Sequence, residues 1–239
     1  ILFFVSLISL FLVPFIGVEV KGSKRWIDLF FLPRFQPIEV LKPFLIIILA
    51  TILCDIKSNI LFKYLISIFL ISFISLLLIA QPDIGQTLLV IFCWAVLIFT
   101  SGINIYILLA IFIAGASLLT YLIIYVPRFD YIQGRIFSFF NRETGTHNFQ
   151  SDKAIESITS GGFFGKGIGE GVLKNRVPEA HTDYIISVIS EEFGVVAIML
   201  ILLLFLILIY MVFKKISFET NDKVKLILIG SISLILMQA

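Results

Sequence analysis

The chain has 239 residues, of which 59% are hydrophobic and 14% are charged, and its formal net charge is +2. A soluble domain has about 45–50% apolar and about 25% charged residues, so this composition excludes a soluble domain and indicates an integral membrane protein. Apolar runs of about 16–25 residues predict transmembrane helices, whereas a membrane barrel would show alternating segments of about ten residues. We expect an all-α, polytopic helical bundle with no nucleic-acid partner.

The predicted spans follow one another along the chain with short polar breaks. They lie at about 1–18, 38–54, 64–80, 86–100, 104–126, 185–213 and 226–239. The first opens inside an apolar run without a methionine or a basic leader, and the last is short. We therefore expect a fragment, with a single membrane domain over 1–239 and no signal peptide. Cys54 and Cys93 lie near or inside spans, where each is most simply a small apolar residue.

The breaks alternate between the two sides of the membrane. Counting crossings puts 19–37, 81–85 and 127–183 on one side. The breaks 55–63, 101–104 and 214–225 then lie on the other. Lys and Arg in short loops normally mark the cytoplasmic side, but both sides are basic here, so charge bias does not decide the orientation.

The long connection 127–183 is the most informative segment, because a structureless loop of this length is uncommon and usually functional. Within it, 150–162 is predicted to form a short helix, with Ser151 or Asp152 capping its start and Gly161 left-handed at its end. GGFFGKGIGEG (161–171) follows, with six glycines in eleven residues. Its spacing matches neither the Walker nor the dinucleotide pattern, so a flexible turn at the membrane surface explains it as well as a phosphate-binding loop does.

A further helix is predicted to begin near Thr182. One stripe of this helix carries Asp183, Ser187, Ser190, Glu191 and Gly194. A carboxylate deep in lipid costs at least about 2.5–3 kcal/mol, so Glu191 and Glu192 should have partners or a cavity. A buried pair that fixes helix packing explains both glutamates without a function, and Asp183 could be a plain charge at the helix start.

Six motifs occur in order along the chain. They are KGSKRWIDL (21–29), RFQPIEVLKP (34–43), QPDIGQTLLV (81–90), the pair Gln150 and Ser151, SGGFFGKGIGEG (160–171) and PEAHTDYIISVISEEFG (178–194). Together they resemble the shape, elongation, division and sporulation (SEDS) family, and more closely its division members than its elongation members. The chain departs from the family pattern at Ile38, where serine is usual, and at Tyr184, where phenylalanine is usual.

The resemblance implies a bundle of roughly ten helices, with about seven present here, that polymerises lipid II into peptidoglycan on the outer face of the bacterial cytoplasmic (inner) membrane. Its implied partners are lipid II, membrane lipids and a single-pass penicillin-binding transpeptidase, and a division member would act at the septum. The implied cofactor stays open, with a divalent cation such as Mg or Mn as the candidate. His147 and His181 lack the spacing of metal ligands, so no metal site is assigned.

Inverting glycosyl transfer needs a general base beside the attacking hydroxyl and cations around the departing pyrophosphate. The resemblance maps the base onto Asp183. The candidate substrate-binding residues are Trp26, Lys24, Arg25, Gln150, Ser151, Lys166, Lys174, Arg176, His181 and Glu191. The candidate structural or positioning residues are Asp83, Gly85, Glu39, Gly161 and Gly162.

Simpler explanations stand beside several of these roles. Each basic residue could be a solvated charge or a contact to a lipid headgroup, and Trp26 could belong to the aromatic belt at the membrane interface. Asp83 could stabilise the tight turn that follows Pro82.

Two other classes of function remain open. A lipid II flippase would carry charges at mid-membrane depth on several spans, and only the span with Glu191 and Glu192 clearly does so. A scaffold that recruits a transpeptidase would need only contact surfaces. We expect the fragment alone to be inactive, because a catalytic cavity with missing walls cannot hold its groups in place.

Overall fold

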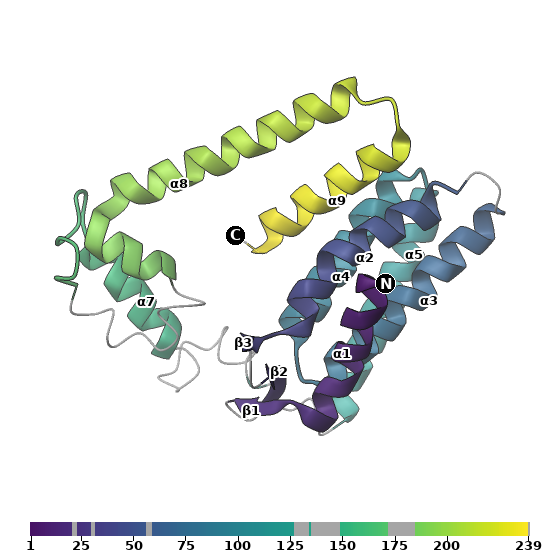
Figure 1. Cartoon of the computed structure of the whole chain (residues 1–239), viewed down its shortest axis with the longest axis horizontal. Helices are drawn as coiled ribbons and strands as arrows, with labels where there is room; N and C mark the ends of the chain where they lie inside the picture. Colours follow the sequence, from purple (N-terminus) through teal and green to yellow (C-terminus); the bar gives the residue numbers. More distant parts are fainter. Residues whose placement is uncertain are drawn as a thin grey trace. The chain divides into compact units, whose positions relative to one another are not determined.

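The computed structural model describes residues 1–20, 23–29, 32–55, 59–126, 134, 149–171 and 185–238 (Figure 1). Its long helices are α1 (Leu2–Ile16), α2 (Pro37–Leu53), α3 (Ile60–Ala80), α4 (Ile84–Thr100), α5 (Ile105–Tyr125), α7 (Phe149–Ser160), α8 (Ile185–Phe218) and α9 (Asp222–Gln238). Each predicted span coincides with one of these helices, and α7 is the predicted short helix. The predominantly helical membrane fold is confirmed.

Three helices among the described residues are long and apolar enough to cross a membrane, namely α3 from Leu61 onward, α5 and α8. Helices α1 and α4 are apolar but have only 15 and 17 residues. A straight crossing of the hydrocarbon core takes about 20 residues. By length and composition the described residues therefore support fewer full spans than the seven predicted.

A small antiparallel sheet occupies part of the first polar break, where no strand was predicted. It consists of β1 (Val18–Val20), β2 (Ser23–Leu29) and β3 (Leu32–Phe35) in the order β1-β2-β3. Trp26 lies opposite Val18, and Ile27 lies opposite Phe35. A period of two needs about four to eight residues to be recognised, and β1 and β3 have only three and four. β2 has seven residues, but its sequence SKRWIDL does not alternate between apolar and polar residues.

The described residues divide into two compact units, 1–110 with 212–239 and 111–211. In the first unit, α2 packs against α1, α3, α4 and α9 (Figure 1). Its buried positions include Leu41, Leu45, Leu49 and Leu53, which recur every fourth residue and so share one face of the helix.

Helix α9 approaches α2 and α4 closely at Gly230. A Cβ atom on Gly230 would lie 2.7 Å from Ile46 Cγ2 and 3.1 Å from Leu97 Cδ2. Only a residue without a side chain fits between these two core residues, so Gly230 sets the spacing of the three helices.

Candidate functional site

The second unit contains a broken helix. Within α8, Gly194 has a φ of 76° and a ψ of −174°, which are not helical angles. A break of this kind leaves backbone amide and carbonyl groups without partners inside the helix. Because lipid offers no hydrogen bonds, such groups need partners from elsewhere in the protein.

The glycine-rich turn 161–171 supplies donors to the carbonyl groups before the break. The amide nitrogen of Lys166 donates to the carbonyl oxygen of Glu191 at 2.9 Å, and that of Gly167 donates to Glu192 at 3.1 Å. The turn is therefore held on α8 by backbone hydrogen bonds. Its composition alone was equally consistent with a flexible turn at the membrane surface.

The same turn supplies acceptors to the amide groups after the break. The amide of Val195 donates to the carbonyl oxygen of Gly162 at 3.0 Å, and the amide of Val196 donates to that of Phe163 at 3.3 Å. Four hydrogen bonds thus run between the turn and α8, two in each direction. They satisfy the backbone groups that the break at Gly194 exposes.

Close approach explains two glycines of this turn, and one of them, Gly165, also has a left-handed φ of 76°. A Cβ atom on Gly161 would lie 1.9 Å from the carbonyl oxygen of Ser190, and one on Gly165 would lie 2.1 Å from that of Glu192. The left-handed residue that follows α7 is Gly162, with a φ of 58°, so the prediction that placed this conformation at Gly161 is wrong. Gly161 is needed because the backbone of α8 passes against it.

Helix α7 begins earlier than predicted. It starts at Phe149, so Ser151 and Asp152 lie inside its first turn and do not cap it. A carboxylate in the first turn still interacts favourably with the helix dipole. Gln150 also lies in this turn, next to Ser151.

Where the structure describes it, the polar stripe of α8 faces the protein interior. The buried residues at its start are Ser187, Ser190, Glu191 and Gly194. Glu191 is fully buried, and its Oε2 accepts a hydrogen bond from Ser157 Oγ at 3.2 Å. Its Oε1 lies 3.3 Å from Lys166 Nζ, in an ion pair. The expected partners of this carboxylate are therefore present, and they offset the cost of removing its charge from water.

Ser157 is a site residue that the sequence analysis missed. It is fully buried on α7, and its hydroxyl also contacts the carbonyl oxygen of Ser187 at 3.2 Å. Ala154, Ser157 and Gly161 are spaced by three and four residues and are all buried. This stripe of small residues was the available signal, because it marks the face on which another helix can approach closely.

In the first unit, a polar cluster surrounds Asp83. Asp83 is the N-cap of α4, and its side chain accepts hydrogen bonds from the amide of Gln86 at 3.5 Å and from Gln36 Nε2 at 2.9 Å. Arg25 lies 3.8 Å away in an ion pair and donates to the carbonyl oxygen of Pro82 at 2.5 Å. The cluster links β2, the start of α2 and the turn before α4.

A second cluster in the first unit is centred on Lys42, whose side chain is only 2% exposed. Lys42 Nζ lies 2.7 Å from Glu39 Oε2 and 3.0 Å from Gln86 Oε1. Gln86 Nε2 donates to Glu39 Oε1 at 2.8 Å, and Gln238 Nε2 donates to Glu39 Oε2 at 3.2 Å. Of these residues only Glu39 was predicted, although a lysine within an apolar helix was a signal for a buried ion pair.

The remaining predicted residues of the first unit lie at its surface. Lys24 is exposed on β2, and Trp26 on the same strand is partly exposed. Gly85 lies in the first turn of α4, and a Cβ atom there would meet no described atom within 4 Å. A larger side chain would therefore fit at this position without a clash.

Several predicted residues lie outside the described part of the chain. They are Asp183, Lys174, Arg176 and His181. Within the described ranges, no group of three or more His, Cys, Asp or Glu side chains could hold a metal ion.

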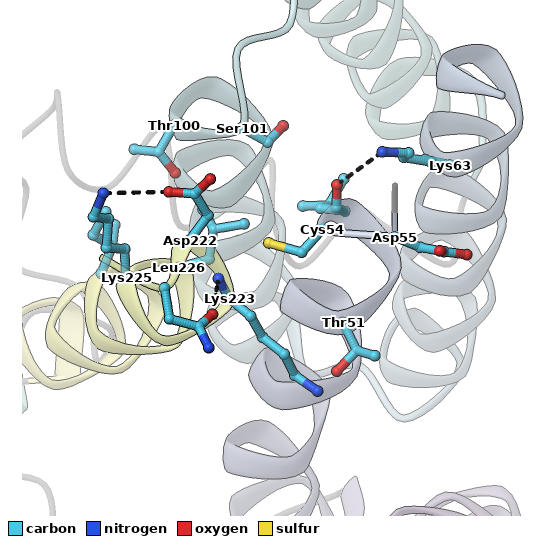
Figure 2. Close-up of a pocket in the computed structure, with 13 residues that line it drawn as sticks. Thr51, Cys54, Asp55, Lys63, Thr100, Ser101, Asp222, Lys223, Lys225 and Leu226 are labelled. Atoms are coloured by element: carbon cyan, nitrogen blue, oxygen red, sulfur yellow. Dashed lines mark hydrogen bonds and ion pairs between the residues drawn. The ribbon is translucent and has the colours of Figure 1, made fainter. Parts of the chain in front are cut away.

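A pocket of about 760 Å³ lies at the opposite end of α2 and α4 from the two polar clusters, where these helices end and α9 begins (Figure 2). Lys63, Asp222, Lys223 and Lys225 are among its charged lining residues, and Lys225 pairs with Asp222 at 3.2 Å. None of the predicted site residues that the structure describes lines this pocket. It is separate from the candidate site.

Comparison with known proteins gives a consistent result. The family model described as "Cell cycle protein", which covers FtsW, RodA and SpoVE, matches residues 1–239. A "Probable peptidoglycan glycosyltransferase FtsW" of Tolumonas auensis is 35% identical over 208 residues, covering 83% of this chain and 52% of the relative. The protein of the same name from Francisella salina is 36% identical over 231 residues, covering 91% of this chain and 56% of the relative. The chain thus spans about half the length of these relatives.

Solved structures share the fold. A chain of a peptidoglycan synthase complex that coordinates polymerization and crosslinking superposes with a TM-score of 0.75 at 26% identity, over 98% of this chain and 65% of its own length. The rod shape determining protein RodA of Thermus thermophilus superposes with a TM-score of 0.63 at 25% identity, over 98% of this chain and 60% of its own length.

Proposed function

Because the chain belongs to the cell cycle protein family of FtsW, RodA and SpoVE, we propose that the complete protein is a peptidoglycan glycosyltransferase that polymerises lipid II in septal cell-wall synthesis. The observation that carries this proposal is the match of relatives named FtsW over most of the chain. The words "peptidoglycan glycosyltransferase" in the relatives' names specify the reaction. The name FtsW, that of the division members of the family, favours the septum as the place of action.

The proposed reaction is an inverting substitution. The 4-hydroxyl of the acceptor sugar attacks the anomeric carbon of the donor, a new glycosidic C–O bond forms, and the bond to lipid pyrophosphate breaks. Asp183 takes the hydroxyl proton, and the pyrophosphate leaves with the bonding electrons. A positioned base of this kind contributes about 10²–10⁴-fold. The family motif and the place of Asp183 just before α8 support this assignment.

Lys166 is the described residue best placed to meet the pyrophosphate. Its side chain is 38% exposed, while its ammonium group is held by the buried carboxylate of Glu191. A cation fixed in this way can stabilise developing negative charge with little reorganisation. Because Glu191 is fully buried, we assign it a positioning role through Lys166 in place of direct substrate contact. Lys174, Arg176, Gln150, Ser151 and His181 remain candidates for substrate binding.

In the first unit, the residues of β2 have two kinds of proposed role, substrate contact at the surface and positioning inside the protein. Lys24 and Trp26 are accessible and are proposed to contact substrate. Arg25 is instead engaged with Asp83 and with the carbonyl group of Pro82, so its first effect is to hold β2 against the turn before α4. A divalent cation such as Mg or Mn would add positive charge at the pyrophosphate, and the proposed steps do not depend on it.

The proposed partner is a single-pass penicillin-binding transpeptidase, and the proposed location is the bacterial inner membrane. The structural likeness to a chain of a peptidoglycan synthase complex supports a partner that crosslinks the strands. The strongly apolar helices support a multi-pass protein.

The deciding experiment is polymerisation of purified lipid II by the complete protein in lipid vesicles, with and without the transpeptidase. Formation of glycan strands supports the proposal. Movement of lipid II across the vesicle membrane without any polymer would instead support a flippase, and stimulation of the transpeptidase without either activity would support a scaffold.

A further inference from the structure

The sequence of α8 fixes the depth of its break in the membrane. No charged residue occurs from Phe193 to Phe213, with Glu192 before this run and Lys214 after it. The segment from Val195 to Phe213 has about 19 residues, which at about 1.5 Å per residue extends roughly 28 Å, close to the ~30 Å thickness of the hydrocarbon core. The break at Gly194 therefore falls at the boundary between the hydrocarbon core and the lipid headgroups.

The glycine-rich turn is held at this boundary by its backbone bonds to α8. The carbonyl oxygen of Phe163 accepts a hydrogen bond from the amide of Val196, in the apolar half of α8 after the break. The amide of Lys166 donates to the carbonyl oxygen of Glu191, before the break. Phe163 is therefore docked on the half of α8 that enters the hydrocarbon core, and Lys166 on the half that carries the polar stripe.

Three apolar side chains of the turn are uncovered in the described part of the chain. Phe163 is 76% exposed, Phe164 is 85% exposed and Ile168 is 78% exposed. The neighbouring surface of α8 is also apolar and accessible at Val195 and Val196. An apolar surface that is continuous with a membrane span, at the depth where acyl chains begin, is stabilised by lipid at about 25 cal/mol per Å² removed from water.

We propose that Phe163, Phe164 and Ile168 form an interfacial anchor that inserts among the lipid acyl chains. The anchor holds the turn at a fixed depth and keeps Lys166 at the level of the lipid phosphate groups. This function is independent of the proposed glycosyl transfer, because it requires only the membrane and the docked turn.

The test measures depth directly in the complete protein reconstituted in nanodiscs. Cys54 and Cys93 are replaced by serine and alanine, and a single spin label is attached through Phe164→Cys or, as a matched control on the same turn, Glu170→Cys. We expect the label at 164 to be relaxed mainly by oxygen, which dissolves in acyl chains, and the label at 170 mainly by a water-soluble nickel complex. A label at 164 that meets the nickel complex as readily as the control, or that is shielded from both reagents, overturns the proposal.

A second measurement avoids labels. In nanodiscs, trypsin should cleave after Lys166 several-fold faster in the double variant Phe163→Ser, Phe164→Ser than in the control variant Ile155→Ser, which removes an exposed apolar side chain from α7. Cleavage sites are identified by mass spectrometry, and helix content by circular dichroism shows whether each variant has folded. Equal cleavage rates in two folded variants would contradict the anchor, and if the double variant fails to fold, the spin-label comparison decides.

Discussion

Lys166 and Glu191 form an ion pair between the glycine-rich turn and α8, with 3.3 Å between Nζ and Oε1 and the carboxylate completely buried. The pair holds one accessible cation, the ammonium group of Lys166, close to the break in α8. It also makes α8 and the turn depend on each other for stability, since the buried charge needs its partners.

We predict that Glu191→Gln lowers the free energy of unfolding by about 1–3 kcal/mol, because it removes a buried charge partner of Ser157 and Lys166. The loss stays below the value for a fully buried pair because Lys166 is partly solvated. Unfolding of the protein in bicelles measures it. As a control, Glu156→Gln removes a carboxylate from the surface pair with Lys153 and should change stability by less than about 0.5 kcal/mol. Equal effects of the two variants would show that burial of Glu191 contributes nothing.

Gly161→Ala should destabilise the second unit by about 3 kcal/mol or more, because the added methyl group would overlap the backbone of α8 at Ser190. The matched control is Gly85→Ala, where the space around the Cβ position is open. That variant should be neutral or stabilising by up to about 1 kcal/mol, since alanine favours a helix over glycine. The melting temperatures of the two variants, measured under the same conditions, test this difference. A harmless Gly161→Ala would mean that the turn does not dock on α8 as described.

Variants of Asp83 should separate its capping role from its charge. Asp83→Ala removes the N-cap of α4 and should cost about 1–2 kcal/mol. Asp83→Asn retains one capping oxygen but loses the pair with Arg25 and, because its amide nitrogen cannot accept, the hydrogen bond from Gln36 Nε2. We expect the asparagine variant to lose less stability than the alanine variant, because it keeps the cap and because Arg25 is one-third exposed. Thermal unfolding gives both values, and equal losses would show that the capping oxygen contributes nothing.

In the complete protein, Asp183→Asn should reduce polymerisation of lipid II by at least about 10²-fold, through loss of the general base. Membrane insertion and binding of the transpeptidase should stay near normal, as shown by fractionation and co-purification. Substantial polymer from this variant would remove Asp183 as the base.

The topology has its own test, in cysteines placed at Gly145 and Lys174. Both positions lie in the long connection 127–183, which we expect on the outer face because the family resemblance places polymerisation there. Both should therefore react with impermeant thiol reagents added to intact cells. Reaction only after lysis would invert the orientation.

The helices were predictable because each is a long apolar run, and the buried face of α8 was predictable because its polar residues recur at helical spacing. The sheet was missed because β1 and β3 have only three and four residues and because β2, with seven, does not alternate between apolar and polar residues. The contacts of Glu191 with Ser157 and Lys166 span 34 and 25 residues in sequence, and local pattern contains no information about which distant segment supplies a partner. Distance in sequence does not explain why Glu39 was selected without Lys42, because the two are only three residues apart and form one ion pair. Their helical spacing was a signal that the sequence analysis did not use.

The four backbone bonds between the glycine-rich turn and α8 constrain how this protein can evolve. Each bond pairs one position of the turn with one position of the helix, so inserting or deleting a single residue between Gly162 and Gly167 would shift at least one pair out of register. These backbone hydrogen bonds do not depend on the identity of the side chains. Residues whose side chains point outward can therefore be substituted, provided that each stays apolar or polar. Among related proteins, the length of this turn should therefore vary less than the identities of its outward residues.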